Sequence, residues 1–184
     1  MQQIKGAVLK SRLAFVERHS GRAAVERVLA TLPPDAQRTL GMLFTSNWYP
    51  FGLGKALDDA IVQVVGGGRP EFFERLGEAS AETNLATIHS SYITRDDAHG
   101  FLAKSPSIYS LYYETGRREY QQTGPKECVL VTHDAETFSA PDCLTVVGWY
   151  RKALEMCGVH GVRIVEEECR ATGGAVCRYR VGWE

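Results

Sequence analysis

The 184-residue sequence lacks several features that mark large classes of protein. It contains no apolar run long enough to span a bilayer, and its first residues lack the apolar core of a secretory signal peptide. Its net charge is only -1, from 21 basic and 22 acidic residues, which gives no electrostatic basis for binding nucleic acid. These absences predict a cytoplasmic protein without a membrane span or a nucleic-acid partner.

Motifs of common enzymes are also missing. Gly66-Gly67-Gly68 follows an expected helix and lacks the Lys-Ser/Thr pair of a phosphate-binding loop. There is no Gly-x-Ser-x-Gly nucleophile elbow. His133 and Asp134 follow Cys128 closely, but nothing in the sequence supplies an oriented base or an oxyanion hole. We therefore expect a protein that is not an enzyme.

Disulfides are not expected, because five cysteines are an odd number in a chain of this length and composition. In a reducing compartment such cysteines are buried apolar residues, metal ligands or reactive thiols. Hydrophobic residues make up 44% of the chain, which is enough to build a core.

Hydrophobic periodicity predicts helices in the first two-thirds of the chain and strands mainly in the last third. Trp48-Tyr49-Pro50-Phe51 is expected at a turn. The expected helices cover residues 4–18, 21–32, 35–42, 53–65, 70–92, 106–115 and 140–157, and the expected strands cover 117–123, 126–133, 159–171 and 175–183. This order predicts one α+β domain, residues 1–184, in which an amino-terminal helical layer packs on a small antiparallel sheet of order strand-strand-helix-strand-strand.

The last two strands are expected to form a hairpin around Thr172-Gly173-Gly174. The expected cross-strand pairs are Cys169 with Cys177, Glu168 with Arg178 and Glu166 with Arg180. Facing residues have their β-carbons about 4.5–5.5 Å apart, so the two thiols should be neighbours. Three interpretations follow: two buried apolar side chains, a disulfide, which a reducing compartment disfavours, or half of a zinc site completed from elsewhere.

Three stretches resemble the 4-vinyl-reductase domain: 142–150, 166–169 and 173–181. That domain shares its architecture with haem nitric-oxide-binding domains and with Bet3-type subunits of a Golgi tethering complex, so the resemblance implies this NO-signalling/Golgi-transport-like fold. The helical part, with Trp48-Tyr49-Pro50 and Ser105-Pro106, resembles an uncharacterised paralogous family abundant in myxobacteria.

The resemblance also implies a set of metal ligands. Aromatic-sensing relatives hold a structural zinc with three cysteines and a glutamate, and the matching residues here are Cys143, Glu166, Cys169 and Cys177. One feature opposes this set. Glu166 and Cys169 are three residues apart, so a regular strand would point them to opposite faces and a bulge would be needed.

Haem is not expected from the sequence. The haem-binding relatives use a Tyr-x-Ser-x-Arg clamp and a proximal histidine. Tyr109 is followed by Ser110-Leu111-Tyr112, which does not match that clamp, and His89 or His99 would be an axial ligand without its support.

The favoured function is a sensor domain that binds a small hydrophobic or aromatic molecule and signals through a homodimer or a protein partner. One alternative is an interaction module similar to the Bet3-type tethering subunits, and another is an accessory factor in tetrapyrrole reduction. Aromatic side chains are the candidates for the pocket lining, namely Trp48, Phe51, Phe73, Tyr92, Tyr109, Tyr112 and Trp149.

Overall fold

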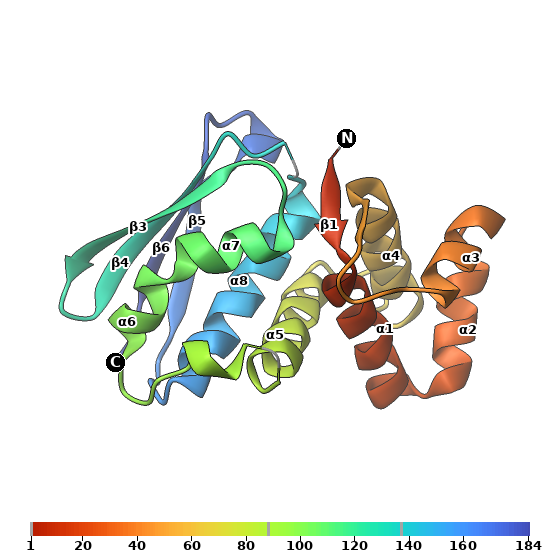
Figure 1. Cartoon of the computed structure of the whole chain (residues 1–184), viewed down its shortest axis with the longest axis horizontal. Coiled ribbons are helices and arrows are strands. Elements are labelled where there is room, and N and C mark those ends of the chain that lie inside the picture. Colours follow the sequence, from red (N-terminus) through yellow and green to blue (C-terminus); the bar gives the residue numbers. More distant parts are fainter. Residues whose placement is uncertain (1, 88, 137) are drawn as a thin grey trace.

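The computed structural model describes residues 2–87, 89–136 and 138–184. Five helices occupy the amino-terminal half (Figure 1). They are α1 (Gly6–Ser20), α2 (Arg22–Ala30), α3 (Pro34–Gly41), α4 (Phe51–Val64) and α5 (Glu71–Leu85). The expected helices therefore form, and apart from the end of α5 their bounds shift by at most two residues, as is usual at helix ends.

Two short strands were not expected from the sequence. β1 (Gln3–Lys5) pairs antiparallel with β2 (Trp48–Pro50), and Ile4 lies opposite Tyr49. The aromatic segment is thus an extended strand rather than only a turn. Three residues are too few for a period-two pattern to be visible in the sequence.

Helix α5 is shorter than expected, because it ends at Leu85 rather than near Tyr92. The backbone N–H of His89 donates to the carbonyl of Asn84 at 3.0 Å. A hydrogen bond that spans five residues in this way is typical of the carboxy-terminal end of a helix. A separate 3-10 turn, η1 (Ser90–Tyr92), follows. No glycine or proline directly follows Leu85 to signal the end of the helix, so a prediction from hydrophobic periodicity alone continued it to Tyr92.

The carboxy-terminal half contains a four-stranded antiparallel sheet of order β3-β4-β6-β5. Its elements are α6 (Ala98–Ala103), α7 (Ser105–Tyr112), β3 (Arg117–Gly124), β4 (Glu127–His133), α8 (Ala140–Met156), β5 (Arg163–Glu168), the 3-10 turn η2 (Arg170–Thr172) and β6 (Cys177–Gly182). The predicted α+β class and the order strand-strand-helix-strand-strand are confirmed. β5 is shorter than expected because Gly158 and Gly161 take positive φ angles before it and η2 follows it.

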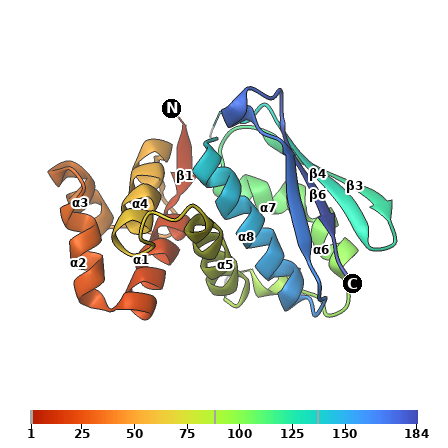
Figure 2. The same cartoon turned by 180° about the vertical axis from the view of Figure 1, so that it is seen from behind.

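The elements are arranged in layers (Figures 1 and 2). The sheet lies at one end of the molecule, α8 and α5 lie side by side in the middle, and α1 to α4 form the other end. Two glycines allow the close approach of α5 and α8. A β-carbon at Gly148 would lie 1.9 Å from the carbonyl oxygen of Glu74, and one at Gly77 would lie 1.9 Å from that of Thr145.

A buried ion pair joins the amino-terminal helices. Nε of Arg12 donates to Oδ1 of Asp58 at 2.9 Å, and Nη1 donates to the carbonyl of Leu76 at 2.8 Å, so α1 is bound to both α4 and α5.

None of the helices in the described ranges combines the length and apolarity that crossing a membrane requires.

Candidate functional site

The hairpin of β5 and β6 contains a bulge that decides which side chains face the core. Glu168 lies opposite Arg178, as predicted, but Glu166 then lies opposite Tyr179, with a register shift between Glu166 and Glu168. The predicted pairing of Glu166 with Arg180 is therefore wrong. One extra residue, Glu167, occupies β5 at this point and changes the alternation of faces.

The bulge redistributes the acidic side chains. Oε1 of Glu167 accepts a hydrogen bond from Nε of Arg180 at 2.7 Å. Oε1 of Glu168 accepts from the backbone N–H groups of Ala175 and Val176, at 2.7 and 3.2 Å, and so closes the turn. Glu166 neither pairs with Arg180 nor closes the turn, and its carboxylate lies on the same side of the hairpin as Cys169.

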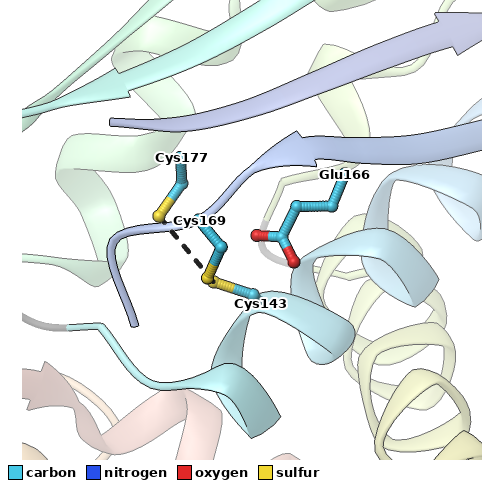
Figure 3. Close-up of side chains that lie close together, drawn as sticks. All are labelled: Cys143, Glu166, Cys169 and Cys177. Carbon is cyan, nitrogen blue, oxygen red and sulfur yellow. Dashed lines mark hydrogen bonds between the residues drawn. The ribbon is translucent and has the colours of Figure 1, made fainter. Parts of the chain in front are cut away.

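Four side chains meet at this point (Figure 3). One ligand atom from each of Cys143, Glu166, Cys169 and Cys177 lies within 4.8 Å of all the others. Cys143 comes from the first turn of α8, where the Ser139 hydroxyl accepts the N–H of Asp142 at 3.1 Å and caps the helix. The structure thus brings together all four residues that the resemblance implied as ligands.

The cluster is compact and buried. Sγ of Cys143 lies 3.5 Å from Sγ of Cys169 and 3.8 Å from Sγ of Cys177. The three cysteines are buried, and Oε1 of Glu166 is buried without a hydrogen-bond partner. A buried oxygen without a partner costs free energy that a cation would remove.

Electrostatics favour one thiolate within the cluster. The hydrogen bond with Cys143 lowers the pKa of Cys177 below its usual value, while the same bond and burial raise the pKa of Cys143. Burial also raises the pKa of Cys169. Three sulfur atoms and one carboxylate oxygen are donors that suit tetrahedral zinc, whose binding would deprotonate the remaining thiols.

A cavity of about 50 Å³ lies between the helices and the sheet. Its wall includes Tyr109 and Tyr112 of α7, Trp149 and Tyr150 of α8, and Arg118 of β3. Three of the seven expected aromatic side chains therefore line it.

The other four expected pocket residues lie elsewhere. Phe51 and Phe73 are buried in the apolar core. Trp48 lies on β2 under the ammonium group of Lys5, whose Nζ is 3.9 Å from the ring centroid. Tyr92 packs edge-on against His89. Aromatic residue type alone did not distinguish core packing from cavity lining.

Sequence reasoning missed Arg118 and Tyr150. Arg118 is 5% exposed, and its Cζ lies 5.2 to 5.5 Å from the ring centroids of Tyr109, Tyr150 and Tyr179. The sequence carried no clear signal for Arg118, because its inward position on β3, opposite the buried Thr132, is known only from the structure.

His99 is engaged in a network at the other end of the sheet. Its Nδ1 lies 2.7 Å from the hydroxyl of Tyr120, and its Nε2 lies 2.9 Å from the carbonyl oxygen of Pro125. Because that carbonyl can only accept, Nε2 carries a proton, and in the neutral ring Nδ1 accepts from Tyr120. The ring also packs on Trp183, with centroids 4.7 Å apart.

Comparisons with known proteins give a family and a fold. The profile of a family described as "Protein of unknown function (DUF2378)" matches residues 65–184. None of the curated proteins matches the chain significantly.

Solved structures of H-NOX proteins are similar in fold. One from K. algicida, in the unliganded Fe(II) state, has a TM-score of 0.73 at 12% identity over 98% of this chain and 96% of that one. Another, from S. oneidensis in the Fe(II)NO state, has a TM-score of 0.72 at 14% identity over 98% and 99%. The H-NOX-like fold is thereby shown, whereas the narrower likeness to 4-vinyl-reductase and Bet3-type proteins stays a prediction.

These comparisons contradict the expectation that haem plays no part. The H-NOX neighbours are iron proteins, and the description of one refers to haem distortion in that family. The expectation rested on the mismatch after Tyr109 and on the lack of support for His89 or His99, whereas 113–117, Tyr-Glu-Thr-Gly-Arg, differs from the clamp pattern only by Thr115 in place of serine. In this conformation both nitrogens of His99 are hydrogen-bonded, so His99 is not available as an axial ligand, and the cavity of about 50 Å³ is much smaller than a haem.

Proposed function

Because this chain belongs to the family described as protein of unknown function (DUF2378) and has an H-NOX-like fold, we propose that it is a non-catalytic sensor domain for a small hydrophobic or aromatic molecule. All 184 residues form that one domain, and the signal passes to a partner protein or through a homodimer. The cavity between α7, α8 and β3 is the observation that carries this proposal.

The position of the cavity supports a sensing role. Its wall combines side chains from α1, α5, α7, α8 and β3, so a molecule inside it contacts both the helical end and the sheet. A bound molecule could therefore bias an equilibrium between two arrangements of these elements. A ligand shifts such an equilibrium only if it binds the two conformations unequally.

One structural zinc, held by Cys143, Glu166, Cys169 and Cys177, belongs to the same proposal. The support is the donor set, the separation of at most 4.8 Å and the unpaired oxygen of Glu166. The metal would fasten the start of α8 to the β5–β6 hairpin. Cys143 and Cys177 also line a second cavity of about 20 Å³ next to Arg118, so the metal would stabilise part of the binding region.

The test uses small neutral aromatic probes and a variant that fills the cavity. Phenol, benzene and indole are titrated against the full chain while the unfolding temperature is followed. We expect at least one probe to raise it saturably, because a ligand that binds only the folded state stabilises that state. Val146 lines the cavity, so Val146→Phe should fill the cavity and abolish the rise in unfolding temperature. Val165→Phe, at a 58% exposed site, should preserve that rise.

Two outcomes would contradict the proposal. One is the absence of a shift with all three probes and with acetate and benzoate. The other is an equal shift in the Val146→Phe and Val165→Phe variants, which would place binding outside the cavity.

A second candidate, an interaction module formed by two copies of the chain, is favoured by one observation. Met42 and Phe44 follow α3 and are 69% and 64% exposed, which is unusual for neighbouring large apolar side chains. If this surface forms a homodimer, Met42→Ser combined with Phe44→Ser converts a dimer to a monomer in sedimentation velocity. A monomeric wild-type chain would exclude this candidate.

A further inference from the structure

Arg118 carries a buried charge for which the surrounding protein provides little compensation. Its guanidinium is permanently protonated, its side chain is 5% exposed, and Nε and Nη1 have no hydrogen-bond partner. None of the ion pairs in the described part of the chain includes it. Its near neighbours are the faces of Tyr109, Tyr150 and Tyr179, which attract a cation only weakly compared with an anion.

The other charged groups of this region have other partners. Arg12 also lines the cavity, but it forms an ion pair with Asp58 and donates to the carbonyl of Leu76. Asp142 lines the smaller cavity with Arg118 and accepts a hydrogen bond from the Tyr113 hydroxyl at 3.1 Å. Burial raises the pKa of Asp142 overall, and the charge of Arg118 lowers it, but the two side chains form neither an ion pair nor a hydrogen bond. Arg118 is thus the charged group with unused donors at the cavity wall.

We propose that the cavity takes a small organic carboxylate, whose oxygens accept the free N–H groups of Arg118. The inference rests on the sensor function proposed above and names the ligand class for it. A buried charge requires an opposite charge and hydrogen bonds, and a carboxylate supplies both. The tyrosine rings and Trp149 surround the apolar part of the same molecule.

The size of the cavity limits the ligand. A volume of about 50 Å³ holds about four water-sized groups, which matches acetate. Arg118 also faces the second cavity of about 20 Å³, so a longer acid could extend from one to the other after a side chain rotates. A single free guanidinium indicates a monovalent ligand rather than a phosphate or a dicarboxylate.

The experiment compares each acid with its neutral amide at constant ionic strength. Acetate and acetamide, then benzoate and benzamide, are titrated into the full chain by isothermal calorimetry. We expect a carboxylate to bind at least tenfold more tightly than its amide, with one site per chain. Arg118→Met should abolish this preference, and Arg117→Met, on the neighbouring exposed residue, should preserve it.

The outcomes separate this inference from the sensor function. Equal binding of an acid and its amide overturns the carboxylate assignment while leaving a small-molecule cavity. If neither acids, amides nor the neutral aromatic probes bind, both proposals fail. Should Arg118→Met not fold, the comparison of acid and amide in the wild-type chain still decides the question, and Arg118→Lys should retain a preference for the acid.

Discussion

The sulfur of Cys143 lies 3.5 Å from the sulfur of Cys169, although the two residues are 26 positions apart and belong to a helix and to the end of a strand. This contact joins the first turn of α8 to the β5–β6 hairpin. With Cys177 and Glu166 beside it, the contact forms a group of four potential metal ligands at the boundary between the helices and the sheet.

Cys143→Ser should remove most of the zinc and lower the unfolding temperature by several degrees. Serine is a poor zinc ligand, and about 1 kcal/mol corresponds to roughly 2–4 °C in a chain of this size. Cys157→Ser is the matched control, because Cys157 is a buried thiol at the other end of α8 and outside the cluster. Elemental analysis of both variants gives the measurement. Equal zinc content in the two variants would rule out Cys143 as a ligand.

The bulge predicts different effects for two adjacent glutamates. Glu166→Gln should weaken zinc binding at least about tenfold, because its carboxylate faces the three sulfurs. Glu167→Gln should leave zinc affinity unchanged and cost at most about 1 kcal/mol, since it loses only a partly exposed ion pair with Arg180. Competition with a zinc chelator measures both affinities. Weaker binding in Glu167→Gln alone would mean that the strand is in the other register.

The contact between α5 and α8 leaves no space for a side chain at Gly148. Gly148→Ala should destabilise the protein by about 1–3 kcal/mol, because the new methyl group would collide with the Glu74 carbonyl. Gly41→Ala is the control, since a β-carbon there would have no atom of another segment within 4 Å and alanine is the better helix former. Denaturant unfolding measures the two changes. A stabilised Gly148→Ala variant would show that the helices are farther apart.

The buried pair of Arg12 and Asp58 predicts a pH-dependent variant. Burial raises the pKa of Asp58 and the charge of Arg12 opposes that rise, so Arg12→Met should raise the pKa further and cost about 3–5 kcal/mol at neutral pH. A raised pKa means that the folded state holds the proton more tightly. Stability is therefore lost as pH increases above about 4, and this loss should be larger in the variant.

Lys55→Met is the control for that pair, because Lys55 forms a partly exposed ion pair with Asp59 on the same helix as Asp58. Its cost should be at most about 1 kcal/mol, with little change in pH dependence. Urea unfolding between pH 4 and pH 7 gives both quantities. Parallel pH profiles for the wild type and Arg12→Met would indicate that Asp58 is not affected by Arg12.

The sequence was sufficient for the class and order of the elements because long periodic segments such as α8 and β4 bury one face. It also placed Cys169 and Cys177 across one turn. The position of the bulge was not predictable from periodicity, because Glu166, Glu167 and Glu168 are chemically alike and only the folded hairpin decides which of them faces inward.

The cavity was harder to predict than the thiol cluster. Tyr109, Tyr112 and Trp149 were recognised by type, but Phe51 and Phe73 have the same character and belong to the core. Arg118 was overlooked because an arginine in a strand is normally exposed. Its significance depends on α7 and α8 covering that side of β3, which is a property of the tertiary structure.

Native mass spectrometry of the full chain, purified without chelator, tests most directly whether the protein binds one structural zinc ion and holds a small molecule. The predicted spectrum shows the mass of the chain plus one zinc and one further small molecule, and denaturation releases both. A spectrum of the bare chain alone, unchanged after incubation with zinc, the aromatic probes and acetate, would contradict it.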